Sequence, residues 1–317
     1  MKKLLWFILG LVIIVLVISP WLPASVGQAV YAEVTDLEAS VYGFEQKAAD
    51  IGEMEMAYYR RPVSAGDAKG AILMLHGYSA NKDVWTRFAS NINEAYDIII
   101  PDMAGHGDTP FDPKWDYSGP AQVKRLVTLL DALDIDKVHL IGNSMGGFIA
   151  AHFALAHPDR VVSATLVDPA GVTSPEPSDM GKLLAQGRNP FEVDTREDFD
   201  EFFAMTMAQP PFFPELVVKA VAQDYIERKP QLQEIFVDFH RRSDMLDDRL
   251  QDIRVPVLLM WGTEDRLIHI SSVQVWEAGV PDIQVQIWEG IGHMPMMEIP
   301  KKSAAVFQGF IDQITRS

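Results

Sequence analysis

Six short apolar runs, each followed within two residues by Gly, Pro or Asp, constrain this chain more than any other feature. They cover residues 71–75, 98–100, 138–141, 161–167, 255–260 and 283–288. Runs of this length between turn residues are typical of buried β-strands. Segments with helical spacing lie between them, such as Val123, Leu126, Val127 and Leu130. Repeated strand–helix alternation predicts an α/β fold, with a mainly parallel sheet and helices on both faces.

One long segment, residues 172–252, interrupts this alternation. It contains no strand-like run, and a loop of that length without secondary structure of its own would be unusual in a compact domain. Four helices are expected within it, over 178–186, 195–208, 214–227 and 231–244. We therefore expect a helical cap, inserted between the two parts of the core at residues 33–171 and 253–317.

The first 32 residues have a different character. Lys2 and Lys3 precede an apolar run over residues 4–18, which is followed by two prolines and Trp21. This layout is typical of a signal anchor or of a cleaved signal peptide. The small-residue cleavage sites lie far from the apolar run, which favours an anchor, with secretion after cleavage as the alternative. Both interpretations place the rest of the chain on the exported side of a membrane, in the periplasm or outside the cell.

The overall composition argues against several functions. The formal net charge is −17, and no cluster of Lys and Arg offsets it, so nucleic acid is not expected as a partner. The chain has no cysteine, which excludes disulfides, thiolate metal sites and cysteine nucleophiles. No motif implies a cofactor, a metal or a protein partner.

The segment GNSMG, residues 142–146, places a serine between small residues directly after the apolar run 138–141. In such a G-x-S-x-G pattern, a sharp turn from strand to helix presents the serine hydroxyl at the helix N-terminus. Ser144 could instead only cap the helix. The strand before it and the Ala- and Gly-rich helix after it favour a nucleophile.

A serine nucleophile needs a base, and the base needs an acid that orients it. His293 follows the last apolar run and is the predicted general base. Asp265 follows the preceding run and is the predicted acid, with Glu264 and Asp168 as alternatives. Because parallel strands end at the same edge of a sheet, these side chains are expected to lie near Ser144.

Ester hydrolysis also requires an oxyanion hole and a site for the acyl group. The predicted oxyanion donors are the backbone N–H of Met145, next to the nucleophile, and that of Tyr78, in the loop after residues 71–75. In the cap, Phe202, Phe212 and Phe213 are predicted to line a substrate pocket, although they could equally pack the cap onto the core.

Several motifs resemble the α/β-hydrolases across about residues 45–315. They are "HGYSANKDVW", "PDMAGHGDT", "GNSMGG", "DPAG", "WGTEDRLIHIS" and "GIGHMPMMEIP". More narrowly, the chain is similar to the membrane-anchored monoacylglycerol lipases and the bacterial family V lipases. The resemblance implies an N-terminal anchor, a helical cap, a Ser-Asp-His triad and a lipid ester substrate with a medium or long acyl chain, such as a monoglyceride. A general carboxylesterase, a carbon–carbon bond or amide hydrolase, and a non-catalytic binding protein remain alternatives on the same fold.

Overall fold

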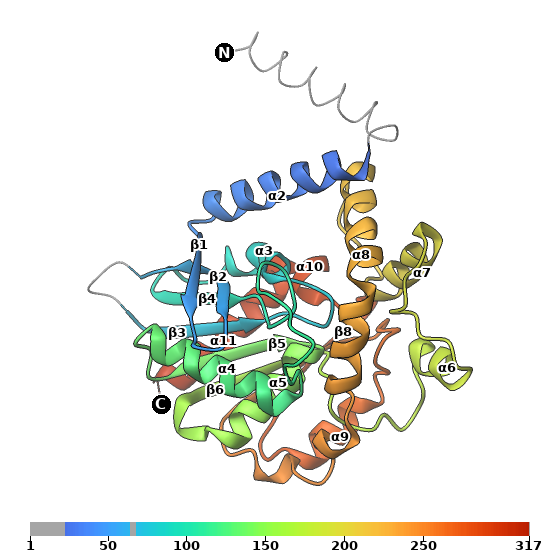
Figure 1. The fold of residues 1–317 in the computed structure, drawn as a ribbon. Helices are drawn as coiled ribbons and strands as arrows, with labels where there is room; N and C mark the ends of the chain where they lie inside the picture. Colours follow the sequence, from blue (N-terminus) through green and yellow to red (C-terminus); the bar gives the residue numbers. More distant parts are fainter. Residues whose placement is uncertain (1–22, 64–67, 317) are drawn as a thin grey trace.

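The centre of the molecule is an eight-stranded sheet with the strand order β1-β2-β4-β3-β5-β6-β7-β8 (Figure 1). The computed structural model describes residues 23–63 and 68–316, and the predicted apolar run over residues 4–18 lies outside them. The strands are β1 (Glu45–Asp50), β2 (Glu55–Arg61), β3 (Gly70–Leu75), β4 (Tyr96–Pro101), β5 (Val138–Asn143), β6 (Val161–Val167), β7 (Val257–Gly262) and β8 (Gln284–Trp288). Strands β3 to β8 are parallel, which confirms the predicted type of sheet.

Two strands at one edge of the sheet were not predicted. Strand β2 pairs antiparallel with β4 and with β1, so the two form an edge hairpin. Nearly every residue of β1 is exposed, and its sequence, EQKAAD, contains no apolar run. An edge strand with a solvated face needs no such run, which is why the search for apolar segments missed it.

Helices cover both faces of the sheet, as predicted. On one face lie α4 (Gly119–Ala132), α5 (Met145–Ala156) and α9 (Ser272–Gly279), whose buried side chains belong to the same apolar cluster as Leu73 and Leu75. On the other lie α3 (Thr86–Ala89), α10 (Pro295–Glu298) and α11 (Pro300–Arg316), clustered with Ile72 and Met74. Alternate residues of β3 therefore enter two separate cores, as the pleat of a strand requires.

The segment between β6 and β7 is helical, and its first two helices lie where they were expected, whereas the last two do not. The observed helices are α6 (Asp179–Ala185), α7 (Arg196–Thr206) and α8 (Glu215–Phe239). The two helices predicted over 214–227 and 231–244 form one helix, which continues through Pro230. A proline inside a helix costs about 3 kcal/mol, because it removes a backbone hydrogen bond. Burial of Leu232 and Ile235 beyond the proline offsets that cost, since each contributes about 1.5–3 kcal/mol.

An N-terminal helix, α2 (Ala24–Val41), joins the cap to the core (Figure 1). It packs closely on α8, where a Cβ atom at Gly27 would lie 2.5 Å from the carbonyl oxygen of Leu216. The division predicted between residues 32 and 33 falls inside this helix. Within the described residues, no helix is long and apolar enough to span a bilayer.

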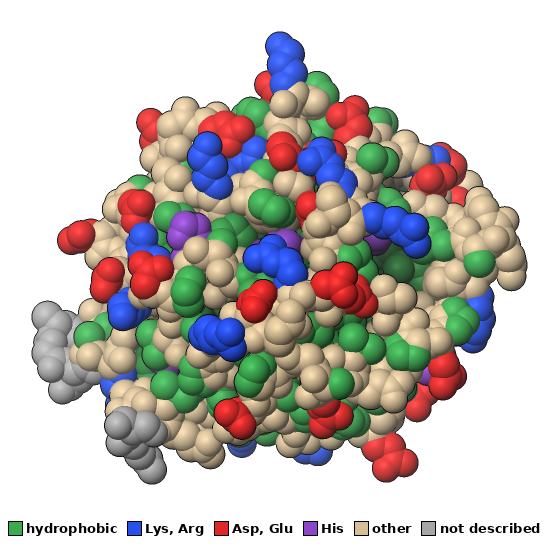
Figure 2. All heavy atoms as spheres, turned by 90° about the horizontal axis from the view of Figure 1, so that it is seen from below, with side chains coloured by type: hydrophobic (Ala, Val, Ile, Leu, Met, Phe, Trp, Pro, Cys, Tyr) green, Lys and Arg blue, Asp and Glu red, His purple; other side chains and the backbone are tan. Residues whose placement is uncertain are grey.

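The outer surface carries both signs of charge. Figure 2 shows one face of the molecule, on which acidic and basic side chains are interspersed and hydrophobic side chains lie exposed between them.

Candidate active site

Ser144 occupies the sharp turn between β5 and α5. Its φ and ψ angles are 57° and −117°, a conformation that is strained for any residue other than glycine. The turn is held from both sides. The Ser144 N–H donates to the carbonyl of Val167 at 2.9 Å, and the Phe148 N–H donates to the carbonyl of Ser144 at 3.0 Å. Tertiary contacts therefore maintain the strain at the predicted nucleophile.

The glycines around Ser144 are required by close backbone contacts. A Cβ atom at Gly142 would lie 2.2 Å from the carbonyl oxygen of Gly146. A Cβ atom at Gly146 would lie 2.3 Å from the carbonyl oxygen of Leu75 on β3. Both distances are far below van der Waals contact. The spacing of the motif thus follows from the packing of α5 against the ends of two strands.

His293 and Asp265 form a buried hydrogen-bonded pair. The two atoms His293 Nδ1 and Asp265 Oδ2 are 2.7 Å apart. Asp265 Oδ1 accepts the backbone N–H groups of Leu267 and Ile268 at 2.8 and 3.0 Å. The two N–H donors orient the carboxylate so that its other oxygen faces Nδ1 of His293, and this contact leaves Nε2 available as a base. The pair has the geometry of the orienting acid and base that the sequence predicts.

Asn143 connects the nucleophile turn to the histidine loop. Its side-chain amide donates to the carbonyl of His293 at 2.9 Å and to the carbonyl of Val167 at 3.2 Å. Sequence reasoning missed this residue, because the second position of G-x-S-x-G carries no signal of its own.

Glu298 braces the other side of the histidine loop and was also missed. Its carboxylate accepts the N–H of Gly292 at 2.9 Å and that of Gln209, from the cap, at 2.7 Å. The His293 N–H in turn donates to the carbonyl of Thr206 at 3.1 Å. Burial raises the pKa of Glu298. The role of Glu298 depends on where the cap lies, so the local sequence could not indicate it.

The two alternative acids are placed very differently. Glu264 is exposed and contacts the hydroxyl of Thr263 rather than the histidine. Asp168 is fully buried, and its carboxylate, that of Asp265 and a ring nitrogen of His293 all lie within 4.8 Å of one another. Such atoms could share a metal ion, but the hydrogen bond from His293 to Asp265 already uses the ring nitrogen nearest the carboxylates.

The predicted oxyanion donors lie on the two loops that meet at Ser144. Tyr78 follows β3 in the loop that contacts the nucleophile turn, where a Cβ atom at Gly77 would lie 3.3 Å from the Ser144 Cβ. Met145 is the first residue of α5. Within residues 23–63 and 68–316, the backbone N–H groups of Tyr78 and Met145 meet no hydrogen-bond acceptor. Both are therefore available to bind an oxyanion.

The cap contacts the loop after β3 through two buried hydrogen bonds. The Tyr78 hydroxyl donates to the carbonyl of Leu232 on α8 at 2.6 Å. The Ser79 hydroxyl donates to the carbonyl of Tyr78 at 2.6 Å and lies 2.8 Å from the hydroxyl of Tyr225, also on α8. Because Ser79 has a φ of 61°, this loop is locally strained. The cap thus helps to hold the loop that carries one predicted oxyanion donor.

Ser144 and His293 line the same cavity, which has a volume of about 490 Å³. The cap contributes mainly apolar side chains: Phe191, Phe199, Phe202, Phe203, Phe213, Val217, Val218 and Val221. Helix α2 and the loops after β3 and β4 contribute mainly polar ones: Gln28, Tyr31, Thr35, Asp36, Asn81, Lys82, Asp83 and Asp108. One cavity therefore has an apolar wall, a polar wall and the side chains of Ser144 and His293.

One of the three predicted pocket residues is wrong. Phe202 and Phe213 line the cavity, whereas Phe212 is 79% exposed and does not. The segment before α8 is extended, and successive side chains of an extended segment point to opposite sides. Only one of two neighbouring phenylalanines can then face the cavity.

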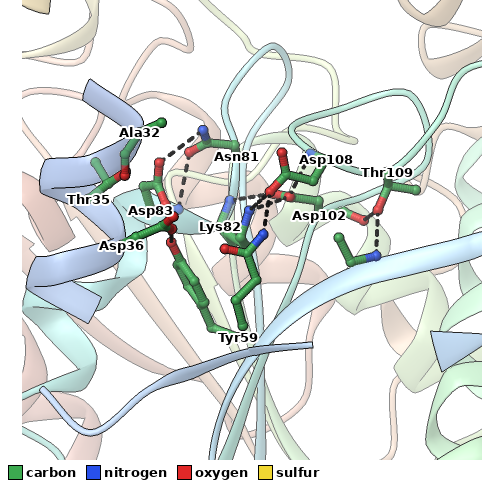
Figure 3. Close-up of polar contacts among 12 residues, drawn as sticks. Ala32, Thr35, Asp36, Tyr59, Asn81, Lys82, Asp83, Asp102, Asp108 and Thr109 are labelled. Carbon is green, nitrogen blue, oxygen red and sulfur yellow. Dashed lines mark hydrogen bonds and ion pairs between the residues drawn. The ribbon is translucent and has the colours of Figure 1, made fainter. Parts of the chain in front are cut away.

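A partly buried polar network attaches α2 to the polar wall (Figure 3). The Tyr31 hydroxyl donates to Asp83 Oδ2 at 3.0 Å. The Tyr59 hydroxyl lies 3.1 Å from Asp36 Oδ1, on α2, and 3.0 Å from Asp83 Oδ1. Two elements distant in the sequence are thereby held together at the cavity.

The polar wall continues from this network to the loop after β4 (Figure 3). Lys82 Nζ lies 2.8 Å from Asp102 Oδ2 and 2.6 Å from Asp108 Oδ2. Gln46, on β1, donates to the same oxygen of Asp108 at 2.9 Å. The buried lysine is thus paired with two carboxylates, as a buried charge requires.

Comparison with known proteins agrees with this geometry. A family model described as the alpha/beta hydrolase fold matches residues 70–300. Lipase 1 of Psychrobacter immobilis is 32% identical over 81% of this chain and 80% of its own. Monoacylglycerol lipase abhd6-B of Xenopus laevis is 27% identical over 86% of this chain and 83% of its own. A crystal structure of a bacterial membrane phospholipase A is 32% identical and covers 100% of both chains with a TM-score of 0.88.

These relatives confirm two predictions, the fold and the enzyme class, a hydrolase of carboxylic esters. The family match spans most of the chain and includes Ser144, Asp265 and His293. The chain belongs to the α/β-hydrolase family.

Proposed function

We propose that this protein is a serine hydrolase of lipid esters, with monoacylglycerols as the substrate class that fits it best. The observation that carries the proposal is the single cavity lined by a strained Ser144, by His293 and by the apolar side of the cap. An acyl chain suits that apolar wall, and a glycerol headgroup suits the polar wall formed by α2 and its neighbours.

In the proposed mechanism, Ser144 Oγ attacks the ester carbonyl while His293 Nε2 accepts its proton. Asp265 stabilises the imidazolium that forms. The N–H groups of Met145 and Tyr78 stabilise the negative charge on the carbonyl oxygen. His293 then protonates the leaving alcohol. A water molecule, deprotonated by the same histidine, releases the fatty acid and restores Ser144.

The size of the cavity supports a substrate of small-molecule size. Its volume of about 490 Å³ lies within the range of roughly 300–1,000 Å³ that is usual for pockets holding one small molecule. Relatives that are named lipases and monoacylglycerol lipases, with 27–32% identity, support the same substrate class.

We also propose that the N-terminal segment, with its apolar run over residues 4–18, anchors the protein in a membrane, with the catalytic domain on the exported side. The support is the sequence itself, two lysines before an apolar run, together with the structure of α2 directly after it. Helix α2 exposes Val34, Leu37 and Val41, side chains that suit the apolar interface of a bilayer. Cleavage and secretion would leave the same catalytic domain free of the membrane.

The test of the function is hydrolysis by the full chain in detergent, with Ser144→Ala as the matched control. The panel contains monoacylglycerols with acyl chains of increasing length, short 4-nitrophenyl esters, an amide and a carbon–carbon bond substrate. Preference for long-chain monoacylglycerols, lost in Ser144→Ala, supports the proposal. Turnover of short esters alone would make the protein a general carboxylesterase, and no ester turnover at all would refute the proposal.

The test of the anchor is fractionation of cells that express the full chain. Retention of the intact protein with membranes after a high-salt wash is expected. Release as a shorter, soluble chain would show that the segment is cleaved instead.

A further inference from the structure

Asp168, directly after β6, is a buried carboxyl that the proposed mechanism does not use. Its Oδ1 accepts the backbone N–H of Gly262 at 3.0 Å. Its Oδ2 is buried and meets no hydrogen-bond partner within the described residues. An unsatisfied buried polar atom costs free energy, so its presence beside a catalytic pair calls for an explanation.

Two other carboxyl groups, those of Asp265 and Glu298, lie close enough to Asp168 to affect its charge. Burial raises the pKa of Asp168 well above its usual value, and the nearby carboxylates of Asp265 and Glu298 raise it further. Asp265 receives two backbone N–H groups and the histidine, whereas Asp168 receives only one N–H. Two adjacent buried carboxyls do not both ionise, and the one with fewer donors keeps the proton. The raised pKa of Asp168 and its single N–H donor both favour the neutral form of this carboxyl.

The backbone at Asp168 is also strained. Its φ is 43°, in the left-handed region that favours glycine, and its N–H donates to the carbonyl of Met260 at 2.9 Å. Ser144, at the end of the neighbouring strand, is the other strained residue beside the catalytic pair. Strain of this kind persists where the surrounding structure requires one side-chain position. Here it keeps the carboxyl of Asp168 within 4.8 Å of both Asp265 and His293.

We propose that Asp168 is a positioning residue that holds the proton of the buried acid pair and becomes the partner of His293 when Asp265 is absent. In the intact enzyme its neutral O–H group is turned toward the Asp265 carboxylate, which it stabilises without adding a second negative charge. When Asp265 is replaced by alanine, the Asp168 proton passes to solvent, and the new carboxylate accepts the N–H of His293 Nδ1. The inference rests on the proposed serine mechanism.

The first experiment compares Asp168→Asn in two backgrounds, with kcat measured on a short 4-nitrophenyl ester. In the enzyme with Asp265 intact, the substitution is expected to lower kcat by less than about threefold, because a neutral group replaces a neutral group. In the Asp265→Ala background, the same substitution is expected to lower kcat by about tenfold or more. Equal factors in the two backgrounds would overturn the proposal, because a merely structural role costs the same in both.

The pH profile of the single variant Asp168→Asn gives a second readout. The acid limb of kcat/KM reports the protonation of His293. In Asp168→Asn, this acid limb is expected to lie at the same pH as in the wild type. If Asp168 were ionised in the wild type, removing its charge would lower the pKa of His293 and move the limb to lower pH. A downward shift of about one unit would therefore overturn the proposal.

A third readout needs no substitution of Asp168. The far-downfield NMR resonance of the His293 Nδ1 proton is expected to persist in Asp265→Ala, and its disappearance there would overturn the proposal. Thermal unfolding of each variant shows whether it is folded. Wild-type turnover and its loss in Ser144→Ala test the proposed function separately, before any Asp168 variant is made.

Discussion

The hydroxyl of Tyr78, on the loop after β3, donates a 2.6 Å hydrogen bond to the carbonyl of Leu232, near the middle of the long cap helix α8. Both groups are buried. The residue whose backbone is a predicted oxyanion donor is therefore tied by its side chain to the cap. Displacement of α8 would alter the loop as well as the cavity wall, so the position of the cap and the catalytic geometry are linked.

Tyr78→Phe should weaken both stability and catalysis. It removes one buried hydrogen bond, which contributes about 1 kcal/mol to the free energy of unfolding. The loop then loses a constraint, so kcat should fall by more than KM rises. Denaturant unfolding and ester kinetics measure the two effects. Tyr96→Phe is the matched control, because the Tyr96 hydroxyl has only a weak 3.5 Å contact with Thr315. Equal kinetics for the two variants would argue against a link to catalysis.

Ser144→Gly should be inactive and yet more stable than the wild type. Glycine adopts a φ of 57° and a ψ of −117° without the steric strain that serine experiences. Relief of that strain should raise the free energy of unfolding by about 1 kcal/mol. Ser144→Ala is the control, because it is equally inactive but retains a Cβ atom. If the two variants unfold at the same denaturant concentration, the turn does not store strain.

Gly27→Val should detach α2 from the cap. The added Cβ atom would lie 2.5 Å from the carbonyl oxygen of Leu216, so the two helices must move apart. A cost of about 1–3 kcal/mol is expected, as for other overpacked sites. Limited proteolysis of the full chain should then cut within α2.

Gly309→Val is the control for this substitution, because a Cβ atom there meets nothing within 4 Å. Gly309 lies in the helix α11. Valine there changes the helix propensity, as it does at position 27, but causes no steric clash. Equal protease resistance of the two variants would contradict a tight α2–α8 contact.

The protein should lose stability as the pH falls from about 6.5 to 4. Burial lowers the pKa of His139 to about 4, whereas the unfolded chain has a histidine pKa of about 6.5. Between these values the unfolded state binds a proton that the folded state does not. The free energy of unfolding therefore decreases as the pH falls, by up to about 1.4 kcal/mol per pH unit for this one histidine.

His139→Gln should reduce that slope without abolishing it. Burial also lowers the pKa of His76 and of His240 to about 4, so these two groups continue to contribute. Chemical unfolding at several pH values measures the slope, and His157→Gln, at a half-buried position, is the control. An unchanged slope in His139→Gln would show that folding does not lower the pKa of this histidine.

The sequence by itself determined the features that depend on local sterics and strand order. Buried parallel strands must be apolar, so their positions were visible as runs of residues. Gly142 is required by a contact with Gly146 inside the turn, and Gly146 by a contact with Leu75 on β3. Their fixed spacing around Ser144 makes the turn recognisable in the sequence. Asp265 and His293 could be predicted as the acid and base because the ends of parallel strands share one edge of the sheet.

Only the tertiary structure decided the features that depend on long-range packing. Burial and distance, rather than residue type, distinguish Asp265, which contacts His293, from the exposed Glu264 and the buried Asp168. Packing against the core carries α8 through Pro230, and the direction of an extended segment removes Phe212 from the cavity. These outcomes arise from contacts between residues far apart in the chain, which no local pattern records. The order of elements could therefore be predicted, whereas the burial and surroundings of the acidic side chains could not.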